Sequence, residues 1–102
     1  MSAMAFWNTT GIVHYRRGDW KAALTALEKA EGLSEGYYKC RNDFFLAMTH
    51  QQLGNKDKAR ACYERAVQWM DKNQSRTPDL PRFRKEAAAV LGLRDEPGAG
   101  AK

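Results

Sequence analysis

The stretch GDWKAALTALEKA, Gly18 to Ala30, has a counterpart in GNKDKARACYERA, Gly54 to Ala66, and the offset from 18 to 54 is 36 residues. The two copies and the residues just before them align these pairs: Gly11 with Ala47, His14 with His50, Asp19 with Asn55, Ala23 with Ala59, Leu27 with Tyr63, Glu28 with Glu64, and Ala30 with Ala66. Self-similarity at a period of roughly 20 to 50 residues is typical of solenoid proteins, whose units stack on one another. The sequence therefore predicts two copies of one structural unit.

Each unit is predicted to be a pair of helices with a short break between them. Gly18 and Gly54 suit the left-handed conformation that ends a helix, and Asp19 and Asn55 follow as caps for the next helix. After each break, apolar residues recur at helical spacing: Trp20, Ala23, Leu24, Leu27 and Ala30 in the first unit, and Ala59, Cys62, Tyr63, Ala66 and Val67 in the second. The prediction is two helical hairpins.

A fifth helix is predicted after the segment TPDLP, which contains a helix start signal. Phe83, Ala87, Val90 and Leu91 form one apolar stripe, which we expect to cover the second hairpin. Two registers relative to the second unit are open. Matching Ala87 to Ala47 gives an offset of 40, whereas matching Leu91-Gly92 to Leu53-Gly54 gives 38.

The repeated pattern resembles the tetratricopeptide repeat, a 34-residue helical hairpin with small and aromatic residues at fixed places. The positions that carry the resemblance are Trp7, Gly11, His14, Gly18, Ala23, Leu27 and Ala30 in the first unit, and Ala47, His50, Gly54, Ala59, Tyr63 and Ala66 in the second. The resemblance implies an all-α superhelix of two hairpins with a C-terminal capping helix. It also implies a non-catalytic module that binds other proteins. The two hairpins, combined with the segment WMDKNQ and the C-terminal helix RFRKEAAAVLG, further resemble the C-terminal repeat region of some large bacterial proteins, notably multidomain Ser/Thr-kinase-like ones.

The expected domain spans residues 3–93. Within it, repeat 1 covers about 4–33, repeat 2 about 37–72 and the capping helix about 79–92, and residues 94–102 form a flexible tail. A chain of 102 residues has room for one such domain. No signal peptide or long apolar run is present, so we expect a cytoplasmic protein without a membrane segment.

No set of residues indicates catalysis, a cofactor or a metal. His14 and His50 occupy equivalent places in neighbouring hairpins, roughly 8 to 10 Å or more apart, which is too far to share one ion. Cys40 and Cys62 have neither zinc-site nor disulfide spacing. Because no nucleophile motif or phosphate loop appears either, the sequence predicts a protein that is not an enzyme.

The net charge of +5, from 17 Lys and Arg against 12 Asp and Glu, favours an acidic partner or serves as a solubilising surface. Nucleic-acid binding is not favoured, because the cluster Arg82, Arg84 and Lys85 lacks interleaved aromatic residues. An acidic or amphipathic protein segment is the expected partner.

Tetratricopeptide arrays hold a partner on the inner face of the first helix of each hairpin. At 100° per residue, Asp43, Leu46, Ala47 and His50 gather on the core side of the second unit. The opposite side, with its counterparts in the first unit, is the predicted partner-binding groove: Asn8, Ile12, Arg16, Arg41, Phe44, Phe45, Met48 and Gln52.

Phe44, Phe45 and Met48 make this groove unusually apolar. A bound partner segment is one explanation. The other is that the fifth helix or a second copy of the chain covers them, so a structural module that forms homo-oligomers is the alternative function.

Overall fold

The same turn ends three of the helices in the structure, a computed structural model that describes residues 2–73 and 77–93. Gly18, Gly54 and Gly92 all have positive φ, between 72° and 86°. After each of them, the next amide N–H bonds back to a carbonyl five residues earlier: Asp19 to His14 (2.9 Å), Asn55 to His50 (2.8 Å) and Leu93 to Ala88 (2.8 Å). This Schellman motif satisfies carbonyls that a helix end would leave unpaired.

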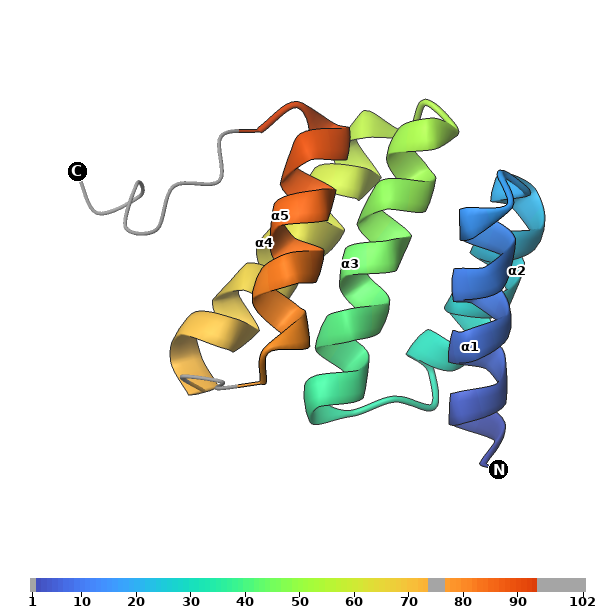
Figure 1. The fold of residues 1–102 in the computed structure, drawn as a ribbon, viewed down its shortest axis with the longest axis horizontal. Helices are drawn as coiled ribbons and strands as arrows, with labels where there is room; N and C mark the ends of the chain where they lie inside the picture. Colours follow the sequence, from blue (N-terminus) through green and yellow to red (C-terminus); the bar gives the residue numbers. More distant parts are fainter. Residues whose placement is uncertain (1, 74–76, 94–102) are drawn as a thin grey trace.

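The described residues contain five helices and no strand. They are α1 (Ala3–Arg16), α2 (Trp20–Glu31), α3 (Gly36–Gln52), α4 (Lys56–Asn73) and α5 (Asp79–Leu91) (Figure 1). The first four form two hairpins, α1–α2 and α3–α4, and α5 packs on the second hairpin. The predicted all-α fold of two hairpins and a capping helix is confirmed. The predicted tail, 94–102, lies outside the described residues.

The register of α5 follows from its final turn. Because Gly92 ends α5 as Gly54 ends α3, the two helices match at the offset of 38. Seven residues before the glycine stand Gly11 in α1, Ala47 in α3 and Lys85 in α5. At Gly11 an added Cβ would lie 2.6 Å from Leu27 Cγ, so this position is where a second helix packs. Lys85 is exposed there, so within 2–73 and 77–93 no second helix packs on this position of α5.

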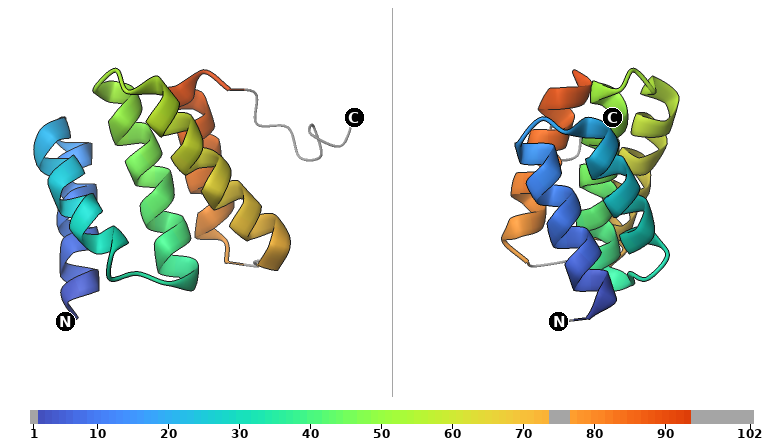
Figure 2. Two further views of the ribbon diagram at one scale, coloured as in Figure 1. Left: turned by 180° about the vertical axis from the view of Figure 1, so that it is seen from behind. Right: turned by 90° about the vertical axis from the view of Figure 1, so that its right-hand side faces the viewer.

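The helices form two layers. Helices α1, α3 and α5 lie side by side in front, with α2 and α4 behind them (Figure 1), and the reverse view brings α2 and α4 forward (Figure 2). Helix α3 stands in the middle, and it packs against all four of the others. As a result, every residue from 42 to 50 is buried.

Candidate interaction surface

The expected groove is filled at its centre. Phe44, Phe45 and Met48 are fully buried, so the prediction that they line an open surface is wrong for this structure. The Phe45 ring lies 5.1 Å from that of Phe83 on α5 and 5.9 Å from that of Tyr15 on α1. Of the two covers considered, the fifth helix is present over Phe45, whereas the Phe44 ring lies 6.0 Å from that of Tyr63 on α4. Whether they contribute to partner binding stays untested.

The prediction for Phe44, Phe45 and Met48 was wrong because it assumed that α3 has one buried side and one open side. A helical wheel separates a core side from an opposite side, which suits a helix that packs on one layer. Helix α3 instead has α1 and α2 on one flank, α4 behind it and α5 on the other flank. The core residues were predicted correctly, since Asp43, Leu46, Ala47 and His50 are all buried, but Phe44, Phe45 and Met48 on the opposite side are buried as well.

Asn8 is also buried, and it joins the two hairpins. Its Nδ2 donates to Asn42 Oδ1 at 2.9 Å, and its Oδ1 accepts a hydrogen bond from the guanidinium of Arg41. Asn8 therefore positions α3 on α1 and does not face solvent, contrary to the prediction.

Four predicted residues remain at least partly accessible: Ile12, Arg16, Arg41 and Gln52. Arg16 forms an ion pair with Glu86 of α5, with Nη2 2.9 Å from Oε1, and this contact raises the pKa of the guanidinium. Burial raises the pKa of the Tyr15 phenol, while a hydrogen bond with Gln52 opposes that shift. The carboxylate of Glu86 therefore balances the charge of Arg16 within the chain.

Arg41 differs from Arg16 in having no carboxylate partner among the described residues. Its Cζ lies 5.5 Å from the ring centroid of Tyr37 and 5.3 Å from that of Tyr38. Its Nε is buried and has no hydrogen-bond partner in the described part of the chain. Tyr38 is 45% exposed beside it, which leaves a cationic and aromatic patch open to solvent.

Tyr37 and Tyr38 are not among the predicted groove residues, of which Arg41 is the first in the second unit. A usable signal was present: Tyr37 and Tyr38 lie four and three residues before Arg41, the spacing at which helix side chains meet. We call Tyr37, Tyr38 and Arg41 the Arg41 patch.

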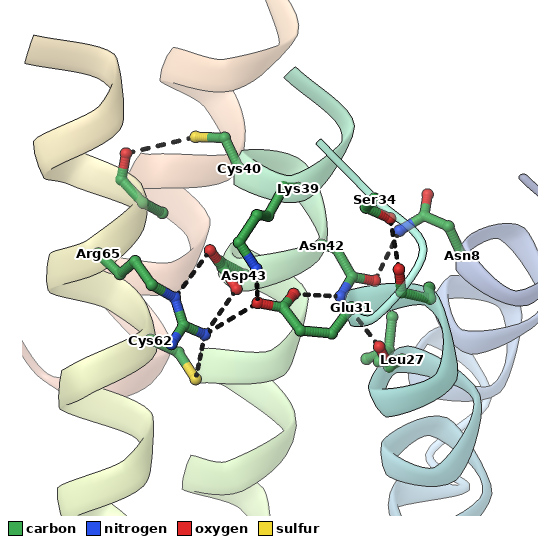
Figure 3. Close-up of polar contacts among 12 residues, drawn as sticks. Asn8, Leu27, Glu31, Ser34, Lys39, Cys40, Asn42, Asp43, Cys62 and Arg65 are labelled. Atoms are coloured by element: carbon green, nitrogen blue, oxygen red, sulfur yellow. Dashed lines mark hydrogen bonds and ion pairs between the residues drawn. The ribbon is translucent and has the colours of Figure 1, made fainter. Parts of the chain in front are cut away.

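A second polar group, absent from the prediction, lies where the hairpins meet (Figure 3). Arg65 of α4 holds the buried Asp43 of α3 through two hydrogen bonds, of 3.0 and 2.8 Å, and lies 3.2 Å from Glu31 of α2. Asn42 donates to Glu31 Oε1 at 2.9 Å and to the Leu27 carbonyl at 3.0 Å. These bonds link α2, α3 and α4, so they fix the angle between the hairpins.

Burial raises the pKa of Asp43 to about 6, against the opposing influence of Arg65. Burial also acts to raise the pKa of Glu31, but hydrogen bonds with Asp43, Lys39 and Asn42 outweigh it, and the net change is a lowered pKa. Because the Asp43 and Glu31 carboxyls interact, ionisation of one opposes ionisation of the other. Asp43 therefore keeps its proton to a higher pH than usual, and Glu31 loses its proton at a lower pH.

The described residues contain no cluster of three or more His, Cys, Asp or Glu side chains that could hold a metal ion. Burial raises the pKa of the Cys40 thiol to about 12 and that of Cys62 to about 11, which suppresses the nucleophilic thiolate. Across 2–73 and 77–93, no helix combines the length and apolar character that crossing a bilayer requires.

Two of the three basic residues in the α5 cluster, Arg82 and Arg84, are paired with acids. Arg82 lies 3.0 Å from Asp79, and Arg84 lies 3.7 Å from Asp71. Charges paired in this way are less available for phosphate contacts than a free basic cluster would be. The geometry thus gives little support to a nucleic-acid interface.

Comparison with known proteins bears on the family. Two family models match the chain, both described as tetratricopeptide repeat, one over residues 6–29 and the other over 44–73. The first match covers most of α1–α2, and the second covers most of α3–α4, so together they span more than half of the chain. No curated protein and no solved structure matches it. From the two hairpins and the two matches, the chain belongs to the tetratricopeptide repeat family.

Proposed function

We propose that this chain is a non-catalytic protein-interaction module that binds a segment of a partner protein on the face formed by α1, α3 and α5. Tetratricopeptide repeats generally mediate protein–protein interaction. Arg41 is the observation that carries the proposal here, because it is a guanidinium without an ion-pair partner among the described residues, held between two tyrosines. Tyrosine and arginine are the residue types most enriched at binding hot spots.

The chemistry of the patch defines the partner. A partly buried guanidinium that has no carboxylate partner among the described residues favours an acidic group, and the net charge of +5 attracts an acidic segment over longer distances. Tyr38 adds apolar area beside it, and the partly exposed Ile12 stands one helical turn after Asn8, the residue to which Arg41 donates. An acidic, amphipathic peptide or helix fits these features, bound without chemistry.

The segment could belong to a separate protein or to a longer parent chain. The narrower resemblance to bacterial kinase-like multidomain proteins would place it in the parent chain. That part of the proposal is tested by asking whether the natural open reading frame encodes further domains.

The binding experiment is a peptide array of acidic and amphipathic sequences probed with three proteins. We expect the wild type to bind a subset of peptides, and Arg41→Glu combined with Tyr38→Ser to lose that subset while the far-UV circular dichroism spectrum stays unchanged. Arg60→Glu is the matched control, because Arg60 is exposed on α4 and pairs with Glu64. Equal losses in both variants, or no bound peptide at all, would contradict the proposal.

A further inference from the structure

Helix α5 presents two carboxylates to the cationic sites of α3 and α1. Tyr37 of the Arg41 patch donates a hydrogen bond to Asp79 Oδ2 at 3.3 Å. Further along α5, Glu86 pairs with Arg16, with Nη2 2.9 Å from Oε1. Asp79 and Glu86 are seven residues apart, so they lie on the same face of α5 and about 10 Å from one another along its axis.

The two cationic sites have nearly the same separation along α1. Asn8 accepts a hydrogen bond from the Arg41 guanidinium, and Arg16 follows Asn8 by eight residues in the same helix. Eight residues of α-helix rise by about 12 Å, which is close to the spacing of the two carboxylates on α5. The Arg41 patch and Arg16 are therefore spaced to receive two acids that stand seven or eight residues apart on one helix.

The Arg16–Glu86 pair crosses the open side of α3. Helices α1 and α5 do not pack on one another, because α3 lies between them (Figure 1). The guanidinium carbon of Arg16 lies 5.3 Å from the ring centroid of Phe45 and 5.9 Å from that of Tyr15. Arg16 thus lies over buried rings of α3 and α1, and Glu86 holds it there.

Both acidic contacts of α5 are accessible to a competing group. The side chains of Asp79, Glu86 and Arg16 are 43%, 32% and 48% exposed. Ion pairs at this exposure contribute little to stability, so a carboxylate from outside can replace them at low cost. Helix α5 itself is held on the second hairpin by buried side chains such as Leu80 and Ala87, which such an exchange leaves in place.

We propose that the partner segment is a helix with two carboxylates seven or eight residues apart, and that Asp79 and Glu86 compete with it for the same two sites. One carboxylate of the partner binds the Arg41 patch, and the other replaces Glu86 on Arg16. When Arg16 turns toward the partner, part of the Phe45 ring is uncovered for an apolar side chain of the same helix.

This inference rests on the proposed function, since it specifies the partner of the same face. The carboxylates of α5 belong to the same chain as the sites that they contact, so their effective concentration there is high. They lower the apparent affinity for the partner, and α5 is thereby an internal competitor.

The experiment measures the binding of two alanine-based helical peptides to the whole chain by fluorescence anisotropy. Each peptide has about 20 residues, two Glu and one Leu, and only the spacing of the acids differs. The acids are seven residues apart in the first peptide. In the second they are four residues apart, which spans about 6 Å and reaches one site only.

We expect the wild type to bind the first peptide more tightly than the second. Glu86→Gln should bind the first peptide about threefold to fivefold more tightly than the wild type does, because no side chain of α5 then competes for Arg16. Arg16→Gln should remove the preference for the first peptide and leave binding of the second unchanged.

Glu64→Gln is the matched control, because Glu64 is an exposed glutamate that pairs with Arg60 on α4, and its loss changes the net charge by the same amount. This variant should bind both peptides as the wild type does. An equal affinity of the wild type and Glu86→Gln for the first peptide would overturn the proposal. An equal gain for both peptides would do so too, since it would indicate a general loosening of α5.

Two further outcomes separate this inference from the function on which it rests. If Arg41→Glu abolishes binding but neither the spacing of the acids nor Glu86→Gln affects it, the proposed function stands and this inference is wrong. If neither peptide binds to any variant, both are wrong. A dimer in light scattering that Arg16→Gln abolishes would also overturn the inference, by assigning Arg16 to a second copy of the chain.

Discussion

Lys29 and Arg65 stand at equivalent positions of the two repeats, and each interacts with the residue that precedes it by 22 positions. The Lys29 ammonium lies 4.2 Å from the ring centroid of Trp7, whereas Arg65 pairs with Asp43. A cation–π contact in one hairpin thus corresponds to an ion pair in the other. Asp43 stands where the first repeat has Trp7, and the residue that it contacts differs accordingly.

The raised pKa of Asp43 makes stability depend on pH. Because the folded pKa of about 6 lies above the usual value, the contribution of this proton is full below about pH 4 and is lost as pH rises through 6. Glu31 acts in the opposite sense, since its lowered pKa adds stability that is lost only at more acidic pH. Between pH 4.5 and 7, the free energy of unfolding of wild type minus that of Asp43→Asn should fall by about 2 kcal/mol. Urea titrations across this range measure the difference.

Asp71→Asn is the control for the loss of one carboxylate, because Asp71 is exposed on α4. A pH-independent difference between wild type and Asp43→Asn would show that Asp43 does not hold a proton in the folded state.

The two thiols offer another test at the residue scale. Cys40 and Cys62 are buried, with pKa values raised to about 12 and 11, so at pH 8 almost no thiolate is present or accessible. Iodoacetamide should therefore modify both only as fast as the protein opens, and within minutes in denaturant. Mass spectrometry measures the extent of modification with time. Rapid modification of the native protein would argue against this packing around α3.

At the scale of elements, the α1–α2 hairpin depends on a close approach at Gly11. A Cβ at this position would lie 2.6 Å from Leu27 Cγ, so Gly11→Ala forces the helices apart. We expect a loss of about 1 to 3 kcal/mol in the free energy of unfolding. Gly32→Ala is the control, since the nearest atom there is 3.9 Å away and φ is −69°, and it should be nearly neutral. Comparable losses in both variants would mean that the close approach is not the cause.

Helix α5 covers the centre of α3 through Phe83. Truncation by Phe83→Ala leaves Phe45 partly uncovered, and for a half-buried ring we expect a loss of about 2 kcal/mol, below the range for fully buried Phe. Binding of a hydrophobic dye should rise as Phe45 becomes accessible. Lys85→Ala on the exposed side of α5 should change stability by less than about 0.5 kcal/mol. If Phe83→Ala changes the free energy of unfolding as little as Lys85→Ala does, the packing of Phe83 on α3 does not stabilise the core.

At the scale of the whole molecule, the features that could be predicted from the sequence are the helix ends and the two hairpins, because these depend on local chemistry. Gly18 and Gly54 mark the breaks because a left-handed turn is a property of a few residues, and the period between them identifies two hairpins. The burial of Phe45 depends instead on where α5 lies, because its ring packs on Phe83, and the position of α5 is decided by tertiary packing. The residues of the Arg41 patch lie on one helix, and Asp43 and Arg65 lie on neighbouring helices. Whether each group is exposed or buried depends on how α3 packs in the whole fold.

The central place of α3 also determines how the protein unfolds. A repeat array can lose its units separately when each hairpin contacts only its neighbour weakly. Here Asn8 and Glu31 of the first hairpin bond to Asn42 and Arg65 of the second, and α3 has neighbours on every side. We expect one cooperative transition, as in most single domains of this size. Trp7 and Trp20 report on the first hairpin, and Trp69 reports on the second.

Two variants separate the reporters: Trp69→Phe leaves emission from the first hairpin, and Trp7→Phe with Trp20→Phe leaves emission from the second. The urea midpoint from fluorescence should equal that from circular dichroism at 222 nm within each variant. If the emission of Trp69 changed at a different urea concentration from the helical signal, the hairpins would be separate folding units. The bonds between Asn42, Glu31 and Arg65 would then be too weak to couple them.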